Sequence, residues 1–336
     1  MPFIKNILKY NSIAVVGLEK NTGKTECLNY ILSKIHDRCS CAVTSIGIDG
    51  ESSDVLFKTH KPEITIYNDM FFITTEKHYR QKKITSEIVD ILNYSSSFMG
   101  RLVVARAVNT GKTLLSGPPD TANLKRLITQ MNTAHNCDLT IVDGALSRLS
   151  LGAPAITDAM ILSTGAAVSA NIPELVRKTK YTCDLISLPK YDNDIAINLK
   201  FIKSGVFAID NDNIIHDLKV NSVFSVDFHS ADFFKYGYTF FISGAVSDKI
   251  IDKFKTQPFA DKITIIIRDF TKVFLTPNVF YSFIKKGGKI LVLDKPNLIA
   301  ITINPWSPSG YVLNSDNLRD ELQSEIDVPI FDIKKL

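Results

Sequence analysis

A glycine-containing segment near the start of the chain carries the residue types that bind phosphate. It reads Gly17-Leu18-Glu19-Lys20-Asn21-Thr22-Gly23-Lys24-Thr25. Glycine lets backbone N–H groups turn inward around an anion. Lys24 would reach the β- and γ-phosphates of a nucleoside triphosphate, and Thr25 would offer its hydroxyl to Mg²⁺. The segment predicts a phosphate-binding loop whose binding residues are Gly17, Lys20, Asn21, Thr22, Gly23, Lys24 and Thr25.

The segments on either side of this loop are those that a phosphate loop requires. Residues 12–16 form a β-branched apolar run, which predicts a buried strand. From Lys24 onward, apolar residues recur at three- and four-residue steps, which predicts a helix with one buried face. The start of that helix would add unpaired N–H groups and the positive end of its dipole. The alternative is an ordinary glycine turn with a solvated lysine.

A second copy of the Asn-Thr-Gly-Lys-Thr sequence occurs at residues 109–113. Apolar segments that resemble strands flank it on both sides, 103–108 and 113–115, and no helix is predicted directly after it. Asn109-Thr110-Gly111 is typical of a turn between two strands of a hairpin. We therefore predict that this copy does not bind phosphate.

Acidic residues that could hold the metal follow two predicted strands. Asp143 ends the apolar run 139–142, as in a Walker B strand, and ligands bind at that end of open α/β sheets. Asp49 and Glu51 follow the predicted strand 42–48 and could bind Mg²⁺ through water or position an attacking water. For all three residues the alternative is a solvated turn. The candidate catalytic residues are Lys24, Asp49 and Glu51, and the candidate metal ligands are Thr25, Asp49 and Asp143.

Strand and helix patterns alternate along the rest of the chain, which predicts the α/β class. Further strands are expected at 102–108, 113–116, 139–142 and 159–162, and helices near 121–132 and 172–182. The polar stretch 191–232 predicts a boundary, after which strands at 238–243, 263–267 and 289–293 alternate with helices near 246–256 and 277–286. We predict a mostly parallel P-loop nucleotide-binding domain over 1–190 and a second, smaller α/β domain over 191–336.

Composition excludes several classes of protein. The 336 residues carry a net charge of +4, without a dense basic stripe, so no nucleic-acid partner is expected. No apolar run is long enough to span a bilayer, and the N-terminus is a poor signal peptide. Five scattered cysteines suit a reducing compartment, and Cys39-x-Cys41 lacks the second ligand pair of a zinc site. We expect a cytoplasmic protein with no membrane association.

The spacing of the loop resembles one branch of the P-loop proteins. Five residues, rather than four, separate Gly17 from Gly23, as in dethiobiotin synthetase and cobyric acid synthase. Three segments together resemble a narrower family, the P-loop subunit of lysine 5,6-aminomutase reactivase. They are Gly17–Thr25, Thr44–Glu51 with Lys58–Lys61, and Asp143-Gly144 with Met160–Gly165.

This resemblance implies a function that composition and spacing do not. Such a subunit would act with a MutS-like second subunit and use ATP and Mg²⁺ to release damaged cobalamin from lysine 5,6-aminomutase. The chain has no Asp-x-His-x-x-Gly cobalamin motif, so it would not hold the cofactor in that way. Two alternatives remain open, an ATP-dependent ligase similar to dethiobiotin synthetase and a nucleotide-binding switch with little turnover. ATP is the default base because no clear Asn-Lys-x-Asp guanine signature is present.

Overall fold

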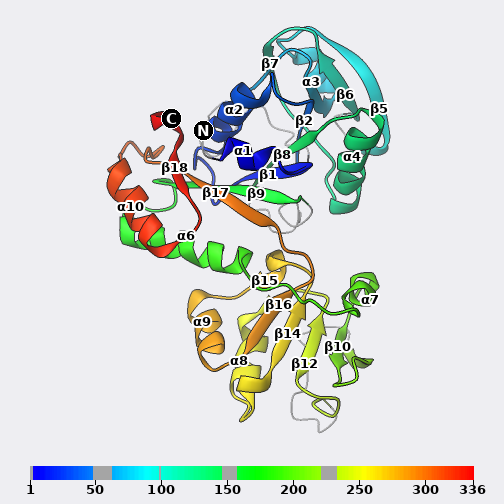
Figure 1. Ribbon diagram of the computed structural model, residues 1–336, viewed down its shortest axis with the longest axis vertical. Coiled ribbons are helices and arrows are strands. Elements are labelled where there is room, and N and C mark those ends of the chain that lie inside the picture. The colour runs from blue at the N-terminus through cyan, green and yellow to red at the C-terminus, as the bar shows by residue number, and fades with distance from the viewer. Residues whose placement is uncertain (1–2, 48–62, 98–99, 146–156, 221–232) are drawn as a thin grey trace. The chain divides into compact units, whose positions relative to one another are not determined.

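The computed structural model describes residues 3–47, 63–97, 100–145, 157–220 and 233–336. The chain divides into two compact units (Figure 1). The first comprises residues 1–180 together with 296–336, and the second comprises residues 181–295. Both units contain parallel strands and helices, so the predicted α/β class is confirmed.

The first unit is built on a mostly parallel sheet, which the described residues form from nine strands. All neighbours from β18 to β4 pair parallel, whereas β6 pairs antiparallel with both β4 and β5. In spatial order the strands are β18 (Ile330–Asp332), β17 (Asn297–Asn304), β9 (Ala159–Gly165), β1 (Ser12–Gly17), β8 (Leu139–Ala145), β2 (Cys41–Ser45), β4 (Phe71–Thr75), β6 (Gly100–Ala107) and β5 (Ser86–Ser97). The carboxyl ends of the parallel strands share one edge, where such sheets bind ligands.

Helices cover both faces of this sheet, as a parallel sheet buried on both sides requires. On one face, α2 (Lys24–Ile35) packs against β1 and β8 through Ile13 and Ile141. On the other face, α4 (Thr121–Ala134) packs near Val142 of the same strand β8. The predicted apolar stripe of α2 is fully buried, as expected from its helical spacing: Cys27, Leu28, Ile31, Leu32 and Ile35. The side chain of Asp120 caps α4 by accepting a hydrogen bond from the Asn123 backbone N–H at 2.9 Å.

The expected hairpin around Asn109–Gly111 is not present. Strand β7 (Gly111–Thr113) pairs antiparallel with β3 (Ile64–Ile66) in a separate two-stranded sheet and does not pair with β6. The turn residues are therefore a connection between two sheets. Strand β7 contains the last three residues of this copy, and no helix begins directly after them, because the next element, α4, starts at Thr121.

Residues 296–336 depart from the predicted domain division. They were expected in the second domain, but β17 pairs with β9 and thereby extends the first sheet, for example at Thr302 beside Ser163. The first unit also contains α1 (Ile4–Ile7), α3 (Glu76–Gln81), α10 (Ser315–Glu325) and η5 (Ile333–Lys335). Helix α6 (Ile172–Ile186) contains the boundary between the two units, which falls after Lys180. The sequence pattern could not reveal this return, because β17 reads as one more strand of an alternating α/β segment.

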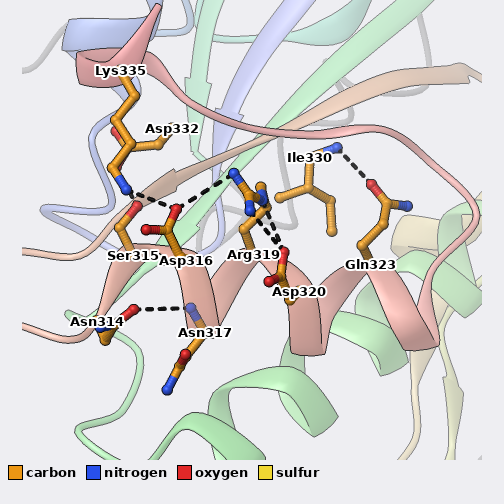
Figure 2. A network of polar contacts seen from close by, with 10 residues as sticks. All are labelled: Asn314, Ser315, Asp316, Asn317, Arg319, Asp320, Gln323, Ile330, Asp332 and Lys335. Carbon is orange, nitrogen blue, oxygen red and sulfur yellow. Dashed lines mark hydrogen bonds and ion pairs between the residues drawn. The ribbon is translucent and has the colours of Figure 1, made fainter.

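Polar contacts hold this C-terminal segment together (Figure 2). Lys335 Nζ donates to Asp316 Oδ1 at 2.8 Å, which links the chain end to the first turn of α10. The backbone N–H of Ile330 donates to Gln323 Oε1 at 3.2 Å, which links β18 to the last turns of the same helix. The ring of Phe331 lies 5.1 Å from that of Phe3, so both ends of the chain contribute to one core. Residues 296–336 are thus an integral part of the first unit.

The second unit has its own sheet and core. Its five-stranded sheet has the order β11-β10-β12-β14-β16, in which β12, β14 and β16 are parallel and β10 is antiparallel to its neighbours. One side of the sheet is covered by a cluster containing Leu199, Phe241 and Ile266. Its elements are α7 (Ala196–Phe201), β10 (Val206–Ile209), β11 (Ile215–Val220), β12 (Thr239–Ile242), β13 (Val246–Ser247), α8 (Asp248–Lys255), η3 (Ala260–Lys262), β14 (Thr264–Ile267), η4 (Phe270–Lys272), β15 (Val273–Phe274), α9 (Pro277–Lys285) and β16 (Lys289–Val292).

Candidate phosphate-binding site

The segment 17–25 connects the end of β1 to the first turn of α2, as predicted. Gly17 is the last residue of β1, and Gly23 is the N-cap of α2 with a left-handed φ of 86°. Asn21 also has a positive φ, of 62°, which asparagine tolerates better than most residues. The Leu18 backbone N–H donates to the Ser163 carbonyl at the end of β9 at 2.8 Å. The loop is thereby anchored to the neighbouring strand of the sheet.

Glycine is required at both ends of this loop because nearby protein atoms leave no room for a Cβ atom there. A Cβ atom at Gly17 would lie 2.7 Å from Thr22 Oγ1 and 2.9 Å from the Glu19 carbonyl oxygen. A Cβ atom at Gly23 would lie 2.9 Å from Asn304 Cβ, in addition to its unfavourable φ. Such close approach of a backbone is typical of loops that wrap an anion.

Two side-chain hydrogen bonds fix the loop from the protein side. The hydroxyl of Thr22, which is buried, donates to the Glu19 carbonyl at 2.9 Å. The side-chain amide of Asn304, at the end of β17, donates to the Asn21 carbonyl at 3.0 Å across 283 residues of sequence. The loop conformation is therefore set by its own residues and by a strand from the far end of the chain.

Lys24 and Asp143 meet at the carboxyl edge of the sheet. Lys24 Nζ lies 2.9 Å from Asp143 Oδ1, and the two side chains are 25% and 13% exposed. Asp143 lies on β8, which runs between β1 and β2, with Val15 and Ser45 as its register partners. The pairing brings the lysine of the predicted phosphate loop and the aspartate of the predicted Walker B strand into direct contact.

The Asp143 carboxylate has capacity for a further partner. Its Oδ1 atom is buried, and the contact with Lys24 has the distance of an ion pair without the angles of a hydrogen bond. Among the residues that the structure describes, no group donates a hydrogen bond to this oxygen. The Lys24 ammonium supplies one compensating charge, and the carboxylate oxygen can still accept a cation or a hydrogen-bond donor. Its position beside the loop suits a hard, oxygen-seeking cation such as Mg²⁺.

A layer of hydroxyl groups lies beneath the loop. The hydroxyls of Ser163 and Thr302 are 2.8 Å apart and connect β9 to β17. Burial raises the pKa of the Cys27 thiol on α2 to about 12, and hydrogen bonds with Thr302 and Ser163 only partly oppose this effect. The thiol is therefore neutral near pH 7 and unsuited to act as a nucleophile. This layer supports α2 against the sheet.

The other predicted site residues have different outcomes. Lys20 and Thr25 lie on the loop and in the first turn of α2, exposed and half-buried respectively. Asp49 and Glu51 lie outside the described residues, as does the basic segment 58–61. In the described ranges no group of three or more His, Cys, Asp or Glu side chains could hold a metal ion, Cys39 and Cys41 included. Of the three predicted metal ligands, Thr25 and Asp143 therefore lie within the described residues and Asp49 does not.

Sequence reasoning missed Asn304 as a residue of this site. In the sequence, Asn304 is marked only by its place at the end of the apolar run Ile301-Thr-Ile-Asn304, directly before a proline. That pattern marks the carboxyl end of a strand, but nothing in it indicates which strand lies beside it. The contact with Asn21 depends on β17 returning to the first sheet.

A second loop packs tightly against the same edge of the sheet. The Gly117 backbone N–H donates to the Gly47 carbonyl at 3.1 Å, and the Gly47 N–H donates to the Pro118 carbonyl at 3.0 Å. A Cβ atom at Gly117 would lie 1.7 Å from the Ser45 carbonyl oxygen. This glycine therefore sets the distance between the loop before α4 and the end of β2.

We expect Gly117→Ala to destabilise the protein by about 3 kcal/mol, the upper part of the range for forced overpacking. The added methyl group can be accommodated only if the loop moves away from β2 and breaks both hydrogen bonds with Gly47. Denaturant unfolding of the variant measures this free energy. Gly244→Ala is the matched control, because a Cβ atom there meets nothing within 4 Å, and its effect should stay within about 0.5 kcal/mol. Equal stability of the two variants would contradict the packing described here.

Comparisons with protein-family models, with curated proteins and with solved structures each return no match. Across the part of the chain that the structure describes, no helix combines the length and the apolar character needed to cross a membrane.

Proposed function

We propose that this chain binds ATP and Mg²⁺ at the loop 17–25 and hydrolyses the nucleotide. The observation that carries the proposal is the contact of 2.9 Å between Lys24 and Asp143, at the junction of a glycine-bounded loop and a helix N-terminus. A cation for phosphate and a carboxylate for metal are thus adjacent, beside backbone N–H groups that can receive an anion. No other pair of described charged residues in the first unit combines this placement with a loop of this form.

The residues present fit a metal-bound triphosphate. Gly17 and Gly23 leave the loop free of Cβ atoms where its backbone turns most tightly. Asp143 Oδ1 is buried without a hydrogen bond among the described residues, so a cation would satisfy it. Thr25 follows Lys24 in the first turn of α2, where its hydroxyl would be the second protein ligand of Mg²⁺. Bound Mg²⁺ would supply charge neutralisation of the phosphate oxygens.

Lys24 would exchange one partner for another when nucleotide binds. Its ammonium group compensates Asp143 in the structure and would turn to the β- and γ-phosphate oxygens in the complex. Asp143, released from Lys24, would then face the metal. The ion pair therefore holds both side chains at the site before ligand arrives, and phosphate must compete with Asp143 for Lys24.

The cellular role that we propose is that of a reactivase subunit. The chain would use ATP hydrolysis, with a MutS-like second subunit, to release damaged cobalamin from lysine 5,6-aminomutase in the cytoplasm. Support for this part of the proposal is the resemblance of three segments to that family: Gly17–Thr25, Thr44–Glu51 with Lys58–Lys61, and Asp143-Gly144 with Met160–Gly165. Gly17 ends strand β1, and Met160–Gly165 makes up most of the adjacent strand β9.

Measurement of phosphate release tests this role. We expect the rate of ATP hydrolysis to rise at least tenfold when cobalamin-inactivated lysine 5,6-aminomutase and the second subunit are added together. An unrelated protein of similar size serves as control, and Lys24→Ala should abolish the response. A rate that is unchanged by the aminomutase would reject the reactivase role while leaving nucleotide binding intact. Hydrolysis that instead required a small carboxylic acid would favour the ligase alternative.

A further inference from the structure

Trp306 is an exposed tryptophan close to the phosphate loop. It is the single tryptophan of the chain, and its side chain is 58% exposed. Tryptophan is highly buried on average, so a tryptophan that is more than half exposed beside a candidate site suggests a binding role. Val312, which is 52% exposed, pairs with Trp306 in an antiparallel bridge. The two side chains provide apolar surface on one short loop.

The position of Trp306 is fixed relative to the phosphate loop through Asn304. The Asn304 side chain donates to the Asn21 carbonyl at 3.0 Å, and its Oδ1 accepts from the Trp306 backbone N–H at 3.2 Å. One side chain thus joins the phosphate loop to the backbone of Trp306. The backbone of Trp306 is therefore connected to the phosphate loop by two hydrogen bonds.

The loop that carries Trp306 is ordered by its own hydrogen bonds. The Leu313 N–H donates to the Pro305 carbonyl at 2.9 Å, and the Ser307 N–H donates to the Tyr311 carbonyl at 3.0 Å. The Tyr311 hydroxyl donates to the Ala166 carbonyl at 2.6 Å, which ties the loop to the end of β9. An aromatic side chain on a loop of this kind loses little freedom when a ligand covers it.

Residues 305–313 also have a composition that suits an uncharged ligand group. They read Pro-Trp-Ser-Pro-Ser-Gly-Tyr-Val-Leu and contain no charged side chain. The phosphates of a nucleotide would be held by Lys24 and the loop N–H groups, whereas the base is flat, aromatic and uncharged. Trp306 offers the π-face on which any base can stack, and Val312 offers adjoining apolar surface.

We propose that Trp306 stacks on the nucleobase of the bound nucleoside triphosphate and so forms the base end of the site. This inference rests on the proposed function, and it adds a residue that recognises the base. It predicts that Trp306 contributes to the affinity for ATP and contributes nothing to the affinity for inorganic tripolyphosphate, which has no base. Replacement of Trp306 by phenylalanine should preserve stacking.

The intrinsic fluorescence of the protein reports directly on this contact, because all of its tryptophan emission comes from Trp306. We expect Mg-ATP to change the emission of the wild-type protein in a saturable manner. Mg-tripolyphosphate should leave the emission unchanged at concentrations at which calorimetry shows it bound. An equal emission change with both ligands would overturn the stacking proposal, since it would report a loop movement caused by phosphate.

Affinities of variants complete the test. Trp306→Ala is expected to weaken Mg-ATP binding about tenfold, within the range for loss of one base–aromatic stack, and to leave tripolyphosphate affinity unchanged. Trp306→Phe should bind ATP within about threefold of wild type. Val108→Ala, an exposed apolar site elsewhere in the first unit at 55% exposure, is the control. Unchanged ATP affinity in Trp306→Ala overturns this inference alone, whereas wild-type protein that binds neither ligand overturns the proposed function itself.

Discussion

Replacement of Lys24 by alanine is expected to weaken Mg-ATP binding at least a hundredfold, which corresponds to about 2.7 kcal/mol. The ammonium group is half-buried at the start of α2, where charge-assisted hydrogen bonds to phosphate are strong. No other lysine could replace it from the first turn of this helix. Isothermal titration calorimetry of the purified chain measures the affinity directly. Lys125→Ala, at an exposed position on α4, should bind ATP as the wild type does.

The same variant should show a smaller effect on stability. Removal of Lys24 leaves the Asp143 carboxylate, 13% exposed, without its ion-pair partner. We expect the free energy of unfolding without nucleotide to fall by about 1–2 kcal/mol, which is insufficient to unfold a domain of this size. A Lys24→Ala protein that is folded and retains wild-type affinity for ATP would show that the loop is not the binding site.

Replacement of Asp143 by asparagine is expected to have the second large effect on activity, because the proposed metal ligand loses its negative charge. Hydrolysis should fall at least a hundredfold, and Mg²⁺ should no longer increase the affinity for ATP. In the absence of Mg²⁺, ATP should bind the variant at least as tightly as the wild type, because asparagine does not compete with phosphate for Lys24 or repel it. A purely structural role for Asp143 would not produce this reversal of the magnesium dependence.

Asp138→Asn provides the matched control for the metal experiment. Asp138 directly precedes the same strand β8, but at its other end, where its carboxylate accepts a hydrogen bond from the Ser40 backbone N–H at 2.9 Å. This variant should retain both hydrolysis and the effect of Mg²⁺. Hydrolysis by Asp143→Asn that still depended on Mg²⁺ as in the wild type would exclude Asp143 as a metal ligand.

Local sequence patterns predicted the strand, loop and helix of the candidate site because these three elements are contiguous in the chain. The strand 12–16, the loop and the helix from Lys24 are contiguous, and each has its own signal in apolar spacing or glycine placement. Asp143 was found because a buried strand that ends in a carboxylate has a recognisable form. The contact with Lys24 arises because β8 lies beside β1, a strand order that the sequence did not predict.

The features of the fold that the sequence did not predict depend on which strands become neighbours in a sheet. The turn sequence at Asn109–Gly111 predicted a hairpin, yet β7 pairs with β3. Gly111 lies so close to a neighbouring segment that a Cβ atom built on it would be 2.4 Å from the Lys83 carbonyl oxygen. Strand β17 has the same pattern as the strands of the second unit, yet it pairs with β9. Such choices are set by tertiary packing of apolar faces, which periodicity along the chain does not encode.

The central claim, binding of Mg-ATP by the native protein, is tested most directly by thermal unfolding of the wild type with and without the ligand. At about 100 times its dissociation constant, Mg-ATP should stabilise the native state by roughly 2.7 kcal/mol, which raises Tm by about 5–10 °C for a unit of this size. The shift should vanish in Lys24→Ala. Identical melting of the wild type with and without Mg-ATP, at ligand concentrations up to several millimolar, would contradict the account.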